Sequence, residues 1–232
     1  MESQGRNIGA RRGAARERLL DAAARHFYLD GIAATGIDTI TATAGVAKMS
    51  LYNNFASKSA LVEAYIERRH EEWLRLYDVR LREAETPRDR ILAVFDAYID
   101  HAEDAYDHAF RGCGLLNAAA ELPAGDPGRL AVRRHKEEVE RILRRELDRL
   151  VAAEDTDTLD TDPSSPPISD EDTDSPATAG PSSPPIAAER AETLATHLSF
   201  LLEGSMARAG LDGTSDQLHT ARALAARLLT RA

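Results

Sequence analysis

The chain has 232 residues, enough for one or two compact domains with a sizeable core. Its 43% hydrophobic content indicates a globular protein, and it lacks the roughly 18 consecutive apolar residues that a membrane span requires. The N-terminus lacks the apolar centre of a secretory signal, so we expect a cytoplasmic protein. The single cysteine, Cys113, excludes an internal disulfide and agrees with a reducing compartment.

The net charge of −10 is distributed unevenly along the chain. Residues 1–62 carry eight Lys and Arg against five Asp and Glu, a net charge of +3. Residues 151–188 carry nine acidic residues and no basic one. The overall sign therefore reports mainly one acidic segment, and the N-terminal region has the charge needed to bind an anion such as nucleic acid.

The first predicted helix covers residues 16–29, with Leu19, Ala23 and Phe27 on one face. Gly31 can adopt the left-handed conformation that ends it. Residues 1–15 form a flexible basic arm before this helix. The arginines of the arm can act as a disordered tail that adds nonspecific attraction, or can reach a narrow minor groove. These are Arg6, Arg11 and Arg12.

Two short helices on either side of Gly45 follow, in the stretch TGIDTITATAGVAKMSLYNNF. A steep turn between two short helices favours a glycine with positive φ, and small or branched apolar groups suit the contact between them. The second helix then presents a polar face on which lysine, serine and asparagine can bind base edges in a major groove. The residues on this face are Ala47, Lys48, Ser50 and Asn53.

Here the sequence resembles the TetR family of transcriptional repressors. The shared pattern consists of Thr35, Ile37, Ile40, Ala44-Gly45-Val46, Tyr52, Phe55 and Ser57-Lys58. The resemblance implies that Thr35, Gly36, Tyr52 and Lys58 hold DNA phosphates, and that Ala47, Lys48, Ser50 and Asn53 face the bases. Three positions depart from the usual pattern: Thr41 replaces alanine where the two helices cross, Gly36 replaces a capping threonine, and Ala47 replaces a serine.

The remainder of the chain reads as further helices, which makes the predicted fold all-α. Ser57 caps a long helix, Thr86-Pro87 opens another, and Asp126-Pro127 opens a third after a short helix at 115–122. Residues 154–186 are rich in Asp, Ser, Thr and Pro and predict a disordered linker. We therefore divide the chain into a helix-turn-helix domain at 1–62 and a helical ligand-binding and dimerisation domain at 63–232.

Two final helices are expected at 187–209 and 215–231, both rich in small residues. Two such helices supply half of a four-helix bundle that a symmetric dimer would complete. The alternative is that they cover the core of their own chain.

The resemblance also implies that a small hydrophobic or aromatic effector binds in the second domain and releases DNA. Candidate lining residues come from an aromatic-rich pair of helices and the segment after them, although an aromatic core explains the same residues. They are Trp73, Phe95, Tyr98, His101, Cys113 and Asn117.

His101, Asp104 and His108 share a helical stripe that could ligate a divalent metal, but their acidic neighbours favour a solvated face. We expect no metal and no cofactor. His135 falls on an apolar helical face and is interpreted as a hydrogen-bonded core histidine. No phosphate-binding glycine loop or nucleophile elbow is present, so we do not expect an enzyme.

These observations predict a homodimeric transcriptional regulator that represses by binding a near-palindromic DNA operator and is released by a small molecule. The alternative is a helical small-molecule-binding or interaction module with a degenerate DNA-binding head. Lys48, Asn53 and Lys58 favour the first reading, because a degenerate head would be expected to lose them.

Overall fold

The structure is a computed structural model that describes residues 2–104, 110–159 and 185–230. These residues form α-helices and no strand, which confirms the predicted all-α fold. The helices are α1 (Glu2–Leu29), α2 (Ile37–Ala44), α3 (Lys48–Asn54), α4 (Lys58–Leu81), α5 (Pro87–Asp104), α6 (Gly114–Glu121), α7 (Pro127–Leu159), α8 (Pro185–Asp212) and α9 (Asp216–Leu228).

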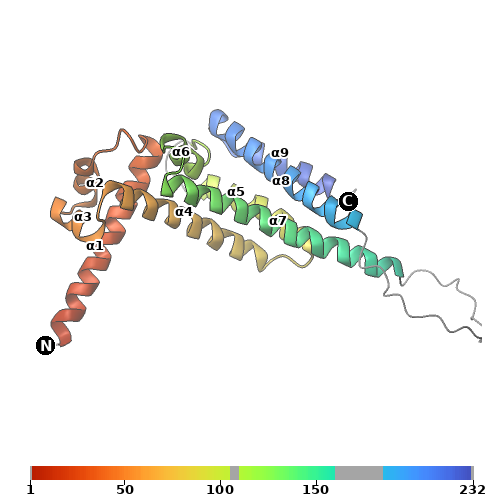
Figure 1. Cartoon of the computed structure of the whole chain (residues 1–232), viewed down its shortest axis with the longest axis horizontal. Coiled ribbons are helices and arrows are strands. Elements are labelled where there is room, and N and C mark those ends of the chain that lie inside the picture. Colours follow the sequence, from red (N-terminus) through yellow and green to blue (C-terminus); the bar gives the residue numbers. More distant parts are fainter. Residues whose placement is uncertain (1, 105–109, 160–184, 231–232) are drawn as a thin grey trace, which may run out of the picture.

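The head of the molecule consists of α1, α2 and α3 at one end of an elongated bundle (Figure 1). Leu19 of α1, Ile40 of α2 and Leu51 of α3 are fully buried in its core. Phe27 continues this core toward α4, where its ring packs edge-on against Tyr65 at 5.5 Å between centroids. The predicted division at 62/63 falls inside α4, which runs unbroken from the head into the second domain.

Helix α1 starts at Glu2, so it is longer than the helix predicted at 16–29 and includes residues 2–15 of the predicted flexible arm. Residues 2–15 contain no proline and several good helix formers, so each added residue can extend the hydrogen-bonded ladder at little cost. The side chains of Arg6, Arg11 and Arg12 lie outside the described part of the structure.

The turn between α2 and α3 follows the chemistry of its residues. Gly45 has a φ of 62° and caps α2 in the left-handed conformation. Its N–H donates to the Ala42 carbonyl at 3.2 Å, and the Val46 N–H donates to that of Thr41 at 3.1 Å. The Thr41 hydroxyl is buried and donates to the Asp38 carbonyl at 3.1 Å, so this departure from alanine is accommodated within α2.

Two of the predicted helix starts are confirmed by their caps. The Ser57 hydroxyl accepts from the Ala60 N–H at 3.1 Å at the start of α4. At the start of α5, the Thr86 hydroxyl accepts from the Asp89 N–H at 3.1 Å, and the Asp89 carboxylate accepts from the Thr86 N–H at 3.0 Å. These bonds satisfy N–H groups that a helix terminus leaves without partners.

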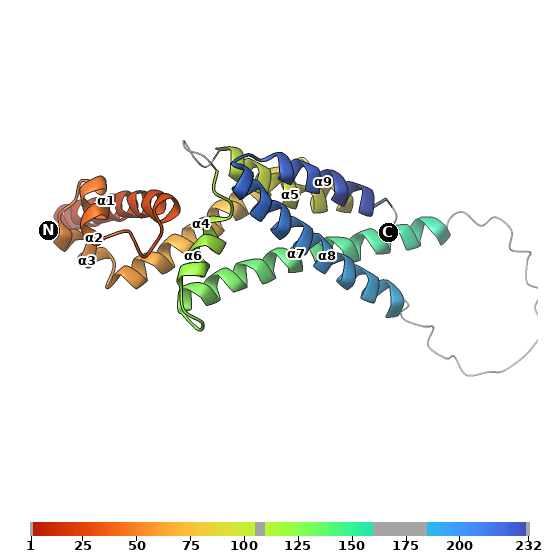
Figure 2. The ribbon, with the colours of Figure 1, turned by 90° about the horizontal axis from the view of Figure 1, so that it is seen from above.

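In the second domain, α4, α5 and α7 run lengthwise, with α8 and α9 packed against them (Figures 1 and 2). Seen from above, α8 crosses α7 at a steep angle (Figure 2). Helix α6 lies at the end of this domain nearest the head (Figure 1). No described helix is long and apolar enough to cross a membrane.

The predicted disordered linker at 154–186 overlaps the ends of two helices, because α7 continues to Leu159 and α8 begins at Pro185. Residues 154–159 of the predicted linker therefore belong to α7, and residues 185–186 belong to α8. No proline interrupts the chain before Pro163, so the long α7 ladder can extend past Leu150. Residues 160–184 lie outside the described residues.

Candidate nucleic-acid interface and internal pocket

Helix α3 divides its residues between the core of the head and its surface. Leu51 is fully buried, whereas Ala47, Lys48, Tyr52 and Asn53 are exposed and Ser50 is half-buried. The predicted base-facing residues are therefore at least partly accessible, with Ala47 as the residue that caps α3 and Lys48, Ser50 and Asn53 within the helix. The sequence interpretation missed Met49, which is 69% exposed on the same helix.

Lys48 is held by an ion pair with Asp38 of α2. The Lys48 ammonium lies 2.8 Å from the Asp38 carboxylate, and both side chains are more than half exposed. The hydrogen bond and the negative charge of Asp38 raise the pKa of Lys48. Because both side chains are exposed, this ion pair adds little stability, so an anion that approached Lys48 could replace Asp38 at a small energetic cost.

The residues predicted to hold phosphates occupy different environments. Tyr52 and Gly36 are exposed, and Gly36 caps α2 in an extended conformation. Thr35 is only 2% exposed, and its hydroxyl donates to the Gly31 carbonyl at 2.6 Å. The Lys58 ammonium donates to the Ile32 carbonyl at 2.6 Å. In this arrangement, Thr35 and Lys58 therefore fasten the turn between α1 and α2.

The same turn is tied to the second domain by Glu121 at the end of α6. Its two carboxylate oxygens accept from the N–H groups of Ile32 at 2.9 Å and Ala33 at 2.7 Å. Gly31 has a φ of 92°, and a Cβ atom there would lie 2.9 Å from this carboxylate. Glu121 thus holds the backbone immediately before the helix-turn-helix.

Arg111 and Gly112 form a second connection between the domains. The Arg111 N–H donates to the Tyr28 hydroxyl at 2.6 Å, and its guanidinium donates to the Tyr28 carbonyl at 2.8 Å. Gly112 packs directly on Gly210 of α8, where a Cβ atom on Gly210 would lie 2.6 Å from the Gly112 backbone. The segment from Arg111 to Glu121 therefore contacts α1, the turn after it and α8.

This segment also contributes to an internal cavity of about 20 Å³. Four of the six predicted pocket residues line it: Trp73, Tyr98, His101 and Cys113. Phe95 is buried but is not among the lining residues. Asn117 is half-buried and donates to the Arg111 carbonyl at 3.1 Å.

A buried polar network crosses the cavity wall. His135 shares a hydrogen bond with His70 through their Nδ1 atoms at 2.7 Å, and its Nε2 lies 3.2 Å from the Tyr98 hydroxyl. Lys136 pairs with Glu203 of α8 at 2.7 Å and donates to the same hydroxyl at 3.3 Å. The prediction that His135 is a hydrogen-bonded core histidine is confirmed.

Burial determines the charge state of this network. It lowers the pKa of His135 to about 2, with nearby Lys136, His70 and His101 acting in the same direction. Burial, together with Arg69 and Lys136, lowers the pKa of His101 to about 4. Burial alone would lower the pKa of Lys136, but Cys113, Tyr98 and Glu203 raise it. The two histidines are therefore neutral and the lysine charged at neutral pH.

The described residues contain no cluster of three His, Cys, Asp or Glu side chains that could hold a metal ion. Of the three residues considered as metal ligands, His101 lines the cavity, and His108 lies outside the described residues.

A steep pair of short helices with a polar outer face, joined to a helical domain, defines the class of helix-turn-helix regulators. Residues 19–65 match the TetR family of bacterial regulatory proteins. No relative among the curated proteins matches the chain.

Solved structures resemble nearly the whole chain. A TetR-family transcriptional regulator from Streptomyces coelicolor is 25% identical with a TM-score of 0.67, over 94% of this chain and 96% of that one. A TetR transcriptional regulator from Chloroflexus aurantiacus is 24% identical with a TM-score of 0.67, over 95% and 96%. Regulatory protein TetR from Rhodobacter sphaeroides is 23% identical with a TM-score of 0.65, over 92% and 97%.

Residues 19–65 therefore match the TetR family, and the chain as a whole has the fold of a TetR-family transcriptional regulator, as its motif predicts.

Proposed function

We propose that this protein is a homodimeric transcriptional repressor that binds a near-palindromic operator and leaves it when a small molecule occupies the second domain. The observation that carries the proposal is the exposed face of α3, where Lys48 and Asn53 stand clear of the core on a family-typical helix-turn-helix. Lysine suits guanine and asparagine suits adenine in a major groove.

We assign DNA contacts to both sides of this face. Lys48, Ser50, Asn53 and Ala47 would meet base edges, and Tyr52 and the exposed α2 start at Gly36 would meet phosphates. Thr35 and Lys58 remain proposed phosphate contacts, but each would first have to leave its carbonyl partner in the α1–α2 turn.

Dimerisation is supported by an apolar outer face on α8 and α9. Phe200 is 70% exposed, Leu211 is 85% exposed, and Gly204 and Ala207 lie between them on the same face of α8. Leu224 and Leu228 are exposed one turn apart on α9. The opposite faces of both helices, with Leu198, Leu202 and Leu218, are buried in the chain's own core. A second copy would therefore cover only the outer faces, and two-fold symmetry would double the recognition helix.

Ligand responsiveness is supported by the links between the cavity and the head. Cys113, Gly114 and Leu115 line the cavity, and the residues on either side of them grip α1 and its following turn. Trp73 is 2% exposed, and its indole N–H has no hydrogen-bond partner among the described residues. A buried indole N–H usually finds an acceptor, which a ligand could supply. A ligand that prefers one arrangement of this segment would shift the spacing of the heads by its difference in affinity.

The proposal is tested by selecting bound duplexes from a random DNA pool with the full-length protein near physiological salt. We expect an enriched near-palindrome and a dimer by light scattering. Introducing Asp at Phe200 should give a monomer that binds the motif weakly, whereas the same change at exposed Val79 should leave the dimer intact. A folded dimer that enriches no motif would contradict sequence-specific regulation and favour the degenerate-head module.

A further inference from the structure

An open groove between α4 and α5 adjoins the small internal cavity. Seven residues line it: Arg69, Glu72, Arg75, Leu76, Val79, Asp100 and His101. Its volume is about 380 Å³, within the usual range for small-molecule sites, whereas the inner cavity of about 20 Å³ holds roughly one water. Arg69 and His101 line both, so the groove and the cavity are neighbours separated by these two side chains.

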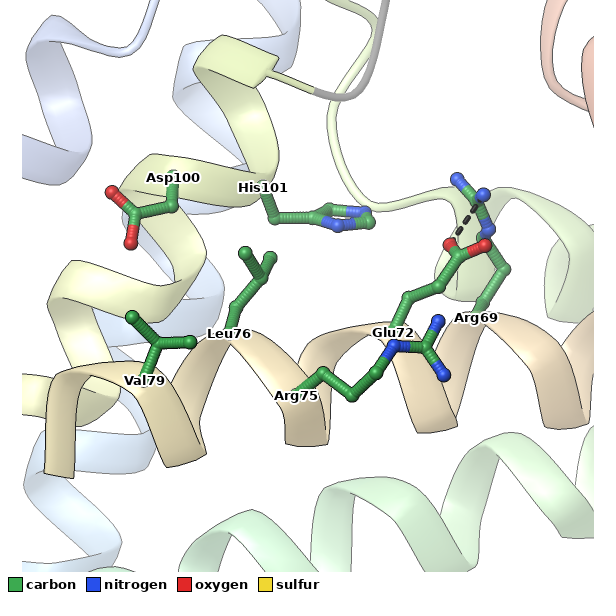
Figure 3. Close-up of a pocket in the computed structure, with 7 residues that line it drawn as sticks. All are labelled: Arg69, Glu72, Arg75, Leu76, Val79, Asp100 and His101. Carbon is green, nitrogen blue, oxygen red and sulfur yellow. Dashed lines mark ion pairs between the residues drawn. The ribbon is translucent and has the colours of Figure 1, made fainter. Parts of the chain in front are cut away.

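The acidic groups of the groove are already paired with arginines of the protein. Asp100 accepts from Arg80 at 2.7 and 2.5 Å. Glu72 accepts from Arg68 at 3.1 Å and also pairs with Arg69 (Figure 3). Neither carboxylate is therefore left to attract a cation.

Arg75 is the charged side chain of the groove that has no ion pair among the described residues. It is exposed and extends beside Glu72 at the mouth of the groove (Figure 3). A guanidinium has a planar set of donors that matches a carboxylate in a bidentate geometry. The groove thus has one uncompensated positive charge, suited to an anion.

The floor beside this charge is apolar. Leu76 points from α4 toward His101, and Val79 lies one turn further along α4, on the side of Asp100 (Figure 3). Val79 is 51% exposed. Because water contact with an aliphatic side chain is unfavourable, an apolar group that covered Val79 would be stabilised there. His101 lies at the end of the groove next to the cavity. Because burial lowers its pKa to about 4, its imidazole is neutral at physiological pH and can contact an apolar chain.

We propose that the groove binds an amphiphilic carboxylate, whose anionic group pairs with Arg75 and whose apolar chain lies on Leu76 and Val79 toward His101. This inference rests on the proposed function in that it names the class of effector. The apolar chain of the ligand would contact His101, which also lines the cavity. The cavity is lined in turn by the segment that hydrogen-bonds to α1. A long-chain alcohol or ammonium compound of equal length lacks the group that Arg75 selects.

The test uses Trp73, the single tryptophan of the chain, as an intrinsic reporter at the cavity wall. Decanoate, decan-1-ol and decyltrimethylammonium are titrated below their micelle concentrations while tryptophan emission is followed. We expect decanoate to bind most tightly. Equal dissociation constants for the three probes, or tightest binding of the cation, would overturn the proposal.

Variants locate the site. Arg75→Gln should raise the dissociation constant for decanoate about five-fold or more, equivalent to roughly 1 kcal/mol, and leave that for decan-1-ol unchanged. Arg75→Lys should restore part of the loss. Arg82→Gln, which removes an exposed arginine outside the groove, is the matched control and should have no effect. Val79→Asp should abolish decanoate binding through repulsion, and unchanged binding in both groove variants would refute the site.

A parallel DNA-binding measurement separates the two proposals. Charge-selective decanoate binding by a protein that enriches no duplex would support this groove and contradict the regulatory role. Sequence-specific DNA binding with no preference for decanoate would support the regulatory role and contradict the carboxylate ligand.

Discussion

The head and the second domain use their polar residues in opposite ways. On α3, Lys48 and Asn53 lie at the surface of a small apolar core, where a partner can reach them. In the second domain, Tyr98 of α5 is turned inward and hydrogen-bonds with His135 and Lys136 of α7. The exposed residues of α3 are therefore accessible as they stand, whereas the cavity must rearrange to admit more than a water-sized group. A larger ligand would therefore require a second arrangement of this domain, as the proposed ligand control needs.

The largest expected effect concerns the internal ion pair. Lys136→Met leaves Glu203 without its ammonium in a site where each side chain is less than a third exposed. Breaking such a pair should lower the free energy of unfolding by roughly 2–4 kcal/mol, measured by urea denaturation. The double variant Lys136→Met/Glu203→Leu should recover most of the loss.

The matched control for this pair is Arg133→Met, which removes an ion pair with Glu137 at 2.6 Å on the surface of the same helix. It should cost less than about 1 kcal/mol. Equal losses of unfolding free energy from the buried and the surface pair would mean that the buried pair stabilises the second domain no more than a surface pair does.

The contact between Gly112 and Gly210 should be nearly as sensitive. Gly210→Ala places a methyl group against backbone that cannot move like a flexible side chain, at 2.6 Å from the Gly112 Cα. We expect a loss of about 2 kcal/mol in unfolding free energy, together with altered DNA affinity, because the displaced segment also holds α1. In contrast, Gly13→Ala meets nothing within 4 Å in α1 and should stabilise by about 0.5–1 kcal/mol. If Gly210→Ala changed neither stability nor DNA affinity, the contact between Gly112 and Gly210 would not couple α8 to α1.

Acid should weaken the second domain before the head. An unfolded histidine has a pKa of about 6.5, whereas burial lowers that of His101 to about 4 and that of His135 to about 2. Below pH 6.5 the unfolded chain binds protons that the folded chain excludes, so stability falls as the pH falls. Each histidine contributes about 1.4 kcal/mol per pH unit until its folded pKa is reached.

The measurement is the urea midpoint of the full chain at pH values from 7 to 4.5, for the wild type and for His101→Gln. We expect the variant to have the shallower pH dependence, by about one proton. Identical slopes would show that His101 is solvated in the folded protein.

The smallest effect concerns the surface pair in the head. Asp38→Asn releases Lys48 and removes a negative charge from the proposed DNA-facing side, so affinity for all duplexes should rise about two- to five-fold. Fluorescence anisotropy with a labelled duplex checks this. A loss of affinity would instead mean that Asp38 orients Lys48 for binding. The change also removes an acidic residue from the first turn of α2, so a small loss in stability is expected.

The two regions also differ in how much of them the sequence could predict. The turn at Gly45 and the caps at Ser57 and Thr86 depend on residues within four positions of one another, so spacing alone located them. The ion pair between Asp38 and Lys48 joins the two sides of that turn at the surface, and the sequence did not predict it.

Contacts between distant positions could not be predicted in this way. Glu121 binds amides about ninety positions earlier in the chain, and His70 meets His135 across 65 positions. Such pairings follow from how the helices pack, which periodicity does not specify. Thr35 illustrates the same limit, because the family pattern identifies the residue but not the bond with Gly31 that buries it.

The most direct test of the central claim compares Lys48→Ala with the wild type on the selected duplex and on duplexes changed at single base pairs. If α3 reads the bases, the variant should lose roughly 1–3 kcal/mol of discrimination at one position of each half-site and keep its nonspecific, salt-dependent binding. An equal loss of affinity on every duplex, with discrimination unchanged, would show that Lys48 holds phosphate and would contradict the assignment of α3 as the reading helix.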